Sequence, residues 1–183
     1  MLFRSDYKPL FSLISEQDKE TVGAKTANEY KNTWVEALDT LGTICADQID
    51  PNARKVEKEQ YQFVDGKEKV SPALTQNMTT LEEYGVGSFG VSTEFGGLGA
   101  PFIFQMAACE LLNRACPSTM LNASWYAAIA DVIERFGSDA LKEEYIPRIA
   151  AGEFSGNMAL TEPDAGSDLS ALKTYGEKQQ DGS

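Results

Sequence analysis

The stretch Gly156-Asn157-Met158-Ala159-Leu160-Thr161-Glu162-Pro163-Asp164-Ala165-Gly166-Ser167-Asp168 joins a short apolar run to a loop of small and hydroxyl-bearing residues. The apolar run at 158–160 is short and bounded by glycine and proline, which favours a buried strand over a helix. Because Pro163 has no N–H and biases Glu162 toward extended geometry, the strand must end before it and a turn must follow.

This turn carries groups that suit a cofactor. Gly166 can adopt a positive φ and admit a flat ligand, and Thr161 and Ser167 offer hydroxyl groups. No side chain in the stretch is a strong base or a nucleophile. From composition alone, a plain strand-to-turn junction capped by Ser167 or Asp168 is favoured over a cofactor site.

The complete pattern changes that balance. It resembles the signature of the acyl-CoA dehydrogenases, flavoenzymes that oxidise the Cα–Cβ bond of acyl-CoA thioesters, in the positions Leu160-Thr161-Glu162-Pro163-x-Ala165-Gly166-Ser167-Asp168-x-x-Ala171-Leu172. Further landmarks resemble the same family in the same order: Glu94-Phe95-Gly96-Gly97-Leu98-Gly99, Phe136-Gly137-Ser138, Lys142, Tyr145-Ile146-Pro147 and Gly152-Glu153. The resemblance covers about residues 26–175 and is weakest between Pro51 and Val70.

The resemblance implies a mainly α fold. It divides the chain into an N-terminal extension at 1–25, a helical N-terminal domain at 26–153 with a hairpin insertion at 60–70, and an incomplete start of a middle β-barrel domain at 154–183. Family enzymes add a C-terminal four-helix bundle. A first barrel strand without its neighbours exposes an unpaired edge, so we expect residues 158–161 to be frayed or paired with another chain.

The resemblance also implies a cofactor, FAD, and residues that contact it. Met158, Leu160 and Thr161 correspond to positions beside the flavin, whose isoalloxazine edge the threonine hydroxyl and nearby N–H groups would bond. Gly166 and Ser167 would let the loop pass close to the cofactor and the CoA arm, with Ser167 contacting the pantetheine.

A second group of candidates lies on the helix over 117–137. Asn122 and Ser124 are polar residues on an otherwise apolar helix, where satisfied core polar groups are the simpler interpretation. In the family this helix helps to line the acyl pocket, so Asn122, Ser124 and Ala128 are candidates for contact with the acyl tail. Trp125 and Tyr126 could shorten that pocket or point into the helix packing.

No residue of this chain is assigned a catalytic role. The family's general base is a glutamate of the C-terminal bundle, and Glu162 is interpreted as an exposed or turn-capping acid. We therefore predict the N-terminal portion of an acyl-CoA dehydrogenase of fatty-acid β-oxidation that is inactive in isolation.

The family also implies partners and leaves alternatives open. It implies an acyl-CoA substrate, an electron-transfer flavoprotein as acceptor and a homo-oligomeric full-length form. The sequence looks closest to the branch with methylthiopropanoyl-CoA and large-type dehydrogenases. An acyl-CoA oxidase fragment, a subunit of a split enzyme and a non-catalytic helical interaction module stay open.

Composition excludes several other classes. A net charge of −12, spread along 183 residues, disfavours nucleic-acid binding. Three single cysteines and no histidine leave no zinc or disulfide pattern. Without a signal-like segment or a long apolar run, we expect a cytoplasmic protein with no membrane insertion.

Spacing predicts the helices. Apolar residues recur at three- and four-residue intervals from Ala27 to Cys45, and Pro51 should stop that helix. An Asp65-Gly66 step predicts the hairpin turn. Further helices should begin after Ser71, at Pro101, at Pro117 and after Ser138, and the helix that begins at Pro101 should be central because its apolar residues surround most of its circumference.

Six glycines between residues 85 and 99 invite a phosphate-loop interpretation. Neither nucleotide-binding fingerprint is present, and the flanking segments are helical. Tight turns that let helices pack closely are the favoured explanation.

Overall fold

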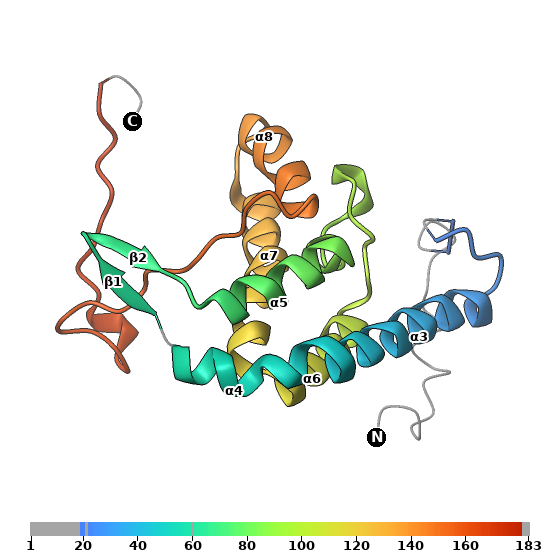
Figure 1. Cartoon of the computed structure of the whole chain (residues 1–183). Coiled ribbons are helices and arrows are strands. Elements are labelled where there is room, and N and C mark those ends of the chain that lie inside the picture. Colours follow the sequence, from blue (N-terminus) through green and yellow to red (C-terminus); the bar gives the residue numbers. More distant parts are fainter. Residues whose placement is uncertain (1–18, 21, 60, 181–183) are drawn as a thin grey trace.

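Helices build the body of the protein in the computed structural model, which describes residues 19–20, 22–59 and 61–180. Figure 1 shows the long helical rod along one side, shorter helices stacked above it, and the hairpin at the end where the C-terminal segment turns. The elements are α3 (Ala27–Ile44), a π-helical segment (Cys45–Ile49), α4 (Asp50–Glu59), β1 (Gln62–Val64), β2 (Lys67–Lys69), α5 (Pro72–Glu83), α6 (Phe102–Ala115), α7 (Pro117–Phe136) and α8 (Asp139–Ala150). The mainly α fold is as predicted, whereas most of the 1–25 extension lies outside the described residues.

The prediction that Pro51 ends the first helix is wrong. The chain continues from α3 through the π-helical segment into α4, and Pro51 is the second residue of α4. A proline within a regular helix lacks one hydrogen bond and clashes with the carbonyl four residues earlier. The wider π turn before it, closed by the bond from the Asp50 N–H to the Cys45 carbonyl, lets the rod continue.

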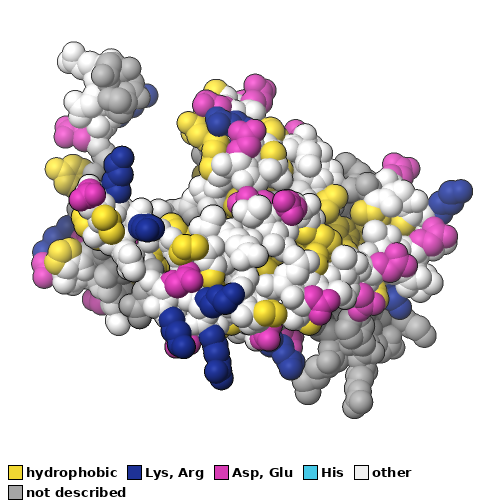
Figure 2. All heavy atoms as spheres, in the orientation of Figure 1, with side chains coloured by type: hydrophobic (Ala, Val, Ile, Leu, Met, Phe, Trp, Pro, Cys, Tyr) yellow, Lys and Arg dark blue, Asp and Glu magenta, His cyan; other side chains and the backbone are white. Residues whose placement is uncertain are grey.

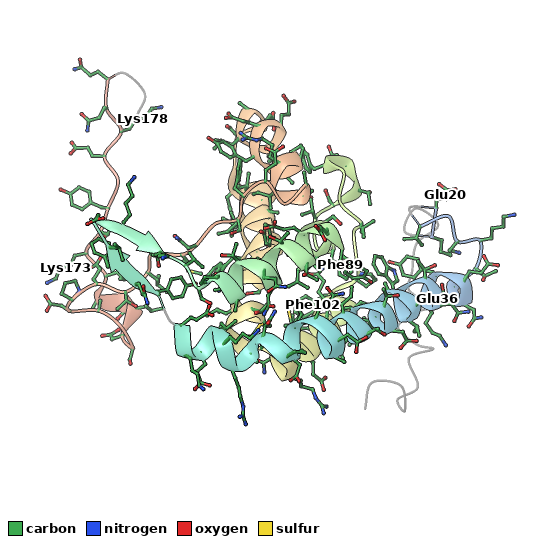
Figure 3. All side chains as sticks on the ribbon, viewed as in Figure 1. Glu20, Glu36, Phe89, Phe102, Lys173 and Lys178 are labelled. Atoms are coloured by element: carbon green, nitrogen blue, oxygen red, sulfur yellow. The ribbon has the colours of Figure 1, made fainter. Side chains whose placement is uncertain are left out.

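The buried face of α3 organises the first part of the core. A capping box starts the helix, in which the Thr26 side chain accepts from the Glu29 N–H and the Glu29 side chain accepts from the Thr26 N–H. The predicted apolar face is buried and packs on α6, with the Trp34 ring centroid 5.9 Å from that of Phe104 and 6.4 Å from that of Phe89. Phe89 lies among the helices in Figure 3.

The hairpin forms where the sequence predicts it. Strands β1 and β2 pair antiparallel with Val64 opposite Lys67. Asp65 and Gly66 have φ values of 51° and 74°, as a type I′ turn requires at both central positions. All six strand residues are exposed.

The remaining helix starts also agree with the sequence. The Ser71 and Ser138 side chains cap α5 and α8, while α6 follows Pro101 and α7 begins at Pro117. Helix α6 is less central than predicted, because Phe102 at its start is 71% exposed.

Some of the glycines between residues 85 and 99 allow close packing and others adopt a positive φ, in line with the favoured interpretation as tight turns. A Cβ atom at Gly90 would lie 2.6 Å from the Cβ of Ala127, and one at Gly97 would collide with the Val91 carbonyl group. Gly85 adopts a φ of 82° just beyond the end of α5.

A buried polar chain links three helices. The Asn52 amide on α4 donates to the Asn77 side-chain oxygen on α5 at 2.9 Å, and the Asn77 amide donates to the Thr119 hydroxyl on α7 at 2.9 Å. The Asn52 amide also donates to the Gln48 carbonyl within the π-helical segment. The network therefore ties the irregular part of the rod to the helices above it.

Charged side chains are distributed as the composition suggests. In Figure 2, acidic and basic groups are interspersed over the visible face without a large patch of one sign. Among the described helices, none is both long enough and apolar enough to cross a membrane.

Candidate cofactor and acyl-CoA site

The predicted strand at residues 158–160 is not formed within the described chain. These residues carry no strand assignment, and Met158 and Leu160 are 60% and 41% exposed. A strand needs a neighbour for its N–H and C=O groups, and the described residues provide none here. The expectation that the run is buried is wrong, and the expectation that it is frayed or paired with another chain stays a prediction.

The segment reaches the loop from the end of α8 and over α7. The Arg148 guanidinium lies 4.4 Å from the centre of the Phe154 ring and bonds the Glu153 carboxylate at 2.7 Å. A Cβ atom at Gly156 would lie 2.6 Å from Cγ1 of Ile129 on α7, so the chain passes this helix closely. Figure 1 shows the segment continuing away from α8 toward the end of the molecule that carries the hairpin.

The loop begins with a tight turn. The N–H of Glu162 donates to the Ala165 carbonyl at 3.0 Å, and the N–H of Ala165 donates to the Glu162 carbonyl at 3.2 Å. Pro163 occupies the second turn position, which its fixed φ favours. Ala165 is buried, so the turn is anchored on the protein.

The Glu162 carboxylate closes the loop at its far end. It accepts the main-chain N–H of Lys173 at 2.9 Å, the N–H of Thr174 at 2.7 Å and the Thr174 hydroxyl. The bond from the Thr174 hydroxyl, followed by the two N–H bonds, holds the pKa of Glu162 below its usual value. The interpretation of Glu162 as a turn-capping acid therefore agrees with the structure.

Thr161 and Gly166 come together across the turn. A Cβ atom at Gly166 would lie 3.6 Å from Cγ2 of Thr161, an ordinary contact distance. The expected positive φ at Gly166 is not found, because its φ lies outside the left-handed region. Neither the backbone nor the described packing requires glycine here.

Donor groups remain available on this loop. Among the described residues, the hydroxyls of Thr161 and Ser167 and the N–H groups of residues 166–168 have no hydrogen-bond partner. Both hydroxyl-bearing side chains are exposed. A small residue flanked by free N–H and O–H donors can bond the edge of a planar, oxygen- and nitrogen-rich ring.

The second group of candidates shares the outer side of α7. Ala128 is exposed on the face that carries Leu121 and Val132, which are also exposed. Asn122 and Ser124 are half-buried and donate to the carbonyls of Ser118 and Leu121, both at 2.8 Å. Each therefore donates to its own helix, but neither lies in the core, so the simpler interpretation as satisfied core polar groups holds only for the hydrogen bonds.

Of the aromatic pair on α7, the contacts place Tyr126 in the helix packing. Tyr126 is buried and donates its hydroxyl to the Glu82 carboxylate at 2.8 Å, so its ring belongs to the helix packing. Burial, with the Glu82 contact, raises the pKa of Tyr126 far above its usual value. Trp125 is half-buried.

The candidates therefore form two parts. Gly166 lies beside the Thr161 side chain, whereas no hydrogen bond or glycine neighbour of the described chain joins that loop to Asn122, Ser124 or Ala128. Gly156, five residues before Thr161, passes close to Ile129 on α7. Nothing in the sequence indicates that the Glu162 carboxylate closes the loop by accepting hydrogen bonds from Lys173 and Thr174. These bonds span eleven and twelve residues, and two of the three donors are main-chain N–H groups.

The described residues contain no metal-binding cluster, and burial disfavours the thiolate form of two cysteines. Within the described residues no group of histidine, cysteine, aspartate and glutamate could hold a metal ion. Burial raises the pKa of Cys45 to about 11 and raises that of Cys109, so neither is a ready thiolate.

The chain forms a helical domain followed by a donor-rich loop of small residues, and known proteins share the helical domain. The family described as "Acyl-CoA dehydrogenase, N-terminal domain" matches residues 34–153. The chain belongs to the acyl-CoA dehydrogenase family, whose members are FAD-dependent flavoproteins.

Individual relatives agree. The 3-methylmercaptopropionyl-CoA dehydrogenase of Ruegeria pomeroyi is 32% identical over 146 residues, which are 80% of this chain and 25% of that protein. Butyryl-CoA dehydrogenase from Megasphaera elsdenii superposes with a TM-score of 0.66 at 22% identity over 81% of this chain and 37% of that one. A chain from a structure of the electron transferring flavoprotein of Acidaminococcus fermentans gives a TM-score of 0.63 at 22% identity, over 76% of this chain and 34% of that one. At these identities the two structures show the fold alone, and the chain spans well under half the length of each protein.

Proposed function

We propose that this chain is the N-terminal portion of an FAD-dependent dehydrogenase that oxidises the Cα–Cβ bond of an acyl-CoA thioester. The observation that carries the proposal is the loop at 161–168, in which Gly166 leaves space beside the Thr161 side chain and the hydroxyl and N–H donors have no partner among the described residues. The proposal assigns residues 26–153 to the helical domain, 60–70 to a hairpin insertion and 154–183 to the start of a β domain.

The residues of the loop fit one edge of a flavin. Thr161 would donate its hydroxyl to the ring, Met158 and Leu160 would supply apolar contact, and Gly166 would leave room for the ring to approach. When bound, FAD supplies the acceptor for the hydride that leaves Cβ. Ser167, exposed beside Gly166, would contact the pantetheine arm.

The outer side of α7 suits an acyl tail. Leu121, Ala128 and Val132 form an exposed apolar face, which a hydrocarbon chain would cover favourably. Ser124 and Asn122 flank this face with their polar groups already bonded to helix carbonyls. They therefore border the tail with one donor each already bonded to the helix.

The proton acceptor for Cα lies outside this chain in the proposal. Glu162 is the carboxylate nearest the loop in sequence, yet both of its oxygens accept hydrogen bonds from Lys173 or Thr174 and its pKa is lowered. Such a carboxylate is a poor base. The isolated chain is accordingly proposed to be inactive.

The substrate and acceptor follow the relatives. Similarity to the Ruegeria protein supports the branch that acts on 3-methylmercaptopropionyl-CoA or related acyl-CoAs. An electron-transfer flavoprotein as acceptor, a homo-oligomeric intact protein, a place in β-oxidation and a cytoplasmic location belong to the same proposal.

Anaerobic titration of the intact protein with acyl-CoAs of increasing chain length tests the proposal. We expect the flavin absorbance to bleach with at least one acyl-CoA, and oxidation by an electron-transfer flavoprotein to exceed oxygen consumption. A purified protein without flavin, or a flavin that no acyl-CoA reduces, would overturn it.

A further inference from the structure

Glu162 holds both ends of the loop that carries the candidate cofactor groups. At the near end its main chain exchanges two hydrogen bonds with Ala165, at 3.0 and 3.2 Å. At the far end its carboxylate takes the Lys173 N–H on one oxygen and the Thr174 N–H and hydroxyl on the other. Figure 3 places Lys173 at the end of the molecule near the hairpin.

The interior of the loop has its own order. The Asp168 carboxylate accepts the Ser170 N–H at 3.1 Å and the Ser170 hydroxyl at 2.5 Å, and a single 3₁₀ turn covers Leu169–Ala171. These bonds are local. Within the described residues, only Glu162 joins the two ends by hydrogen bonds, and the one other link between them is the exposed ion pair of Asp164 with Lys173.

We propose that Glu162 is a positioning residue for the flavin and acyl-CoA, which fixes Thr161, Gly166 and Ser167 through the closed loop. The inference rests on the proposed function, because these three residues are its cofactor and substrate contacts. Thr161 directly precedes Glu162, and Gly166 follows Ala165, the residue that Glu162 bonds through its main chain. If the Glu162 carboxylate lost its hydrogen bonds, Thr161, Gly166 and Ser167 would all be held less firmly, although each residue would still be present.

The loop itself offers a matched control. Asp164 is a carboxylate two residues away whose only recorded partner among the described residues is the Lys173 ammonium, at 3.8 Å, with both side chains about four-fifths exposed. An exposed pair of this kind contributes little. Asp164→Ala therefore removes the same charge as Glu162→Ala without opening the loop.

The test compares Glu162→Ala, Glu162→Gln and Asp164→Ala in the intact protein, by amide hydrogen exchange at residues 166–172, FAD dissociation, and KM and kcat with acyl-CoA. Loss of charge-assisted bonds in an exposed loop should speed exchange about three- to tenfold in Glu162→Ala. We expect FAD loss and KM to rise by a similar factor, with a smaller change in kcat. Glu162→Gln, which keeps one acceptor oxygen, should recover part of each effect, and Asp164→Ala should match the wild type.

Two results separate the inference from the proposed function. If the wild type holds FAD and oxidises acyl-CoA but Glu162→Ala matches Asp164→Ala in FAD loss and KM, the positioning role is wrong, whether or not exchange changes. If the wild type neither holds FAD nor oxidises any acyl-CoA, the proposed function fails and the positioning role with it.

Discussion

The side-chain amide of Asn77 donates to the hydroxyl of Thr119 at 2.9 Å, and both residues are almost fully buried. This bond joins α5 to α7, while the oxygen of the same amide accepts from Asn52 on α4. A buried polar group is costly when its partner is lost. The polar chain therefore helps to hold α7, with its proposed acyl-facing side, in a fixed position on the rod.

Asn77→Ala should be strongly destabilising, because it leaves Asn52 and Thr119 with unpaired buried groups. We expect a loss of about 2–4 kcal/mol in the free energy of unfolding. Urea unfolding followed by circular dichroism measures it. Asn122→Ala is the control, since the Asn122 amide bonds only its own helix, and it should change stability by no more than about 0.5 kcal/mol. Equal effects of the two variants would contradict the role given to the network.

Gly166→Ala should separate folding from cofactor binding. A Cβ atom there meets only Thr161 at 3.6 Å, so we expect unchanged thermal unfolding of the apoprotein. If a flavin approaches the main chain at this point, the same methyl group should weaken FAD binding about tenfold. Fluorescence titration of the apoprotein with FAD gives the affinity.

Gly97→Ala is the control for Gly166→Ala, and the opposite effect on the unfolding temperature is expected for it. Its Cβ atom would collide with the Val91 carbonyl group, so the unfolding temperature should fall, although Gly97 lies outside the proposed site. A Gly166→Ala protein that loses stability and keeps its FAD affinity would reverse both expectations.

The Glu59 carboxylate should make stability depend on pH. It accepts the Ser71 hydroxyl at 2.7 Å and the Ala73 N–H at 3.1 Å, and these bonds lower the pKa of Glu59 from 4.5. A lowered pKa in the folded state stabilises the protein above the unfolded value, and this contribution is lost as the pH falls through the folded value.

The unfolding temperature of the wild type should therefore exceed that of Glu59→Gln at pH 7. The difference should shrink as the pH falls below 4.5. Paired thermal scans from pH 7 to pH 3 test this. A difference that grows toward acid pH would contradict the assignment.

Ala128→Phe should shorten the acyl chains that the intact enzyme accepts. Because Ala128 lies exposed on the apolar face of α7, a large ring there would occupy the proposed tail site. We expect kcat/KM for long acyl-CoAs to fall about tenfold or more relative to short ones. Asp131→Asn, which removes only the exposed pair with Arg135, should leave that ratio unchanged. An unaltered chain-length profile in Ala128→Phe would place the tail elsewhere.

Local signals allowed much of the fold to be predicted. The turn at Asp65-Gly66 and the cap at Ser71 depend on neighbouring residues, and both are found as expected. Pro51 misled because the π turn that accommodates it leaves no mark in residue spacing. The hydrogen bond between Asn77 and Thr119 spans 42 residues, so no periodicity could indicate it.

In the candidate site, too, local features could be predicted from the sequence and contacts between distant residues could not. The family resemblance singles out the loop at 161–168, and Glu162 is interpreted from the sequence as an exposed or turn-capping acid, but the donors at Lys173 and Thr174 required the structure. The strand expected at 158–160 depends on a neighbour that the described chain does not provide. Local sequence can favour extended backbone, but pairing is a property of two segments.

The central claim is that this chain supplies one part of a flavin site and not the whole. The ratio of FAD to protein, measured by absorbance on the purified 183-residue chain and on the intact protein, tests it most directly. We expect the chain to fold, to purify without stoichiometric flavin and to leave acyl-CoA unoxidised, and the intact protein to hold about one FAD per subunit. A folded chain that by itself holds stoichiometric FAD and dehydrogenates butyryl-CoA or a longer acyl-CoA would contradict the claim.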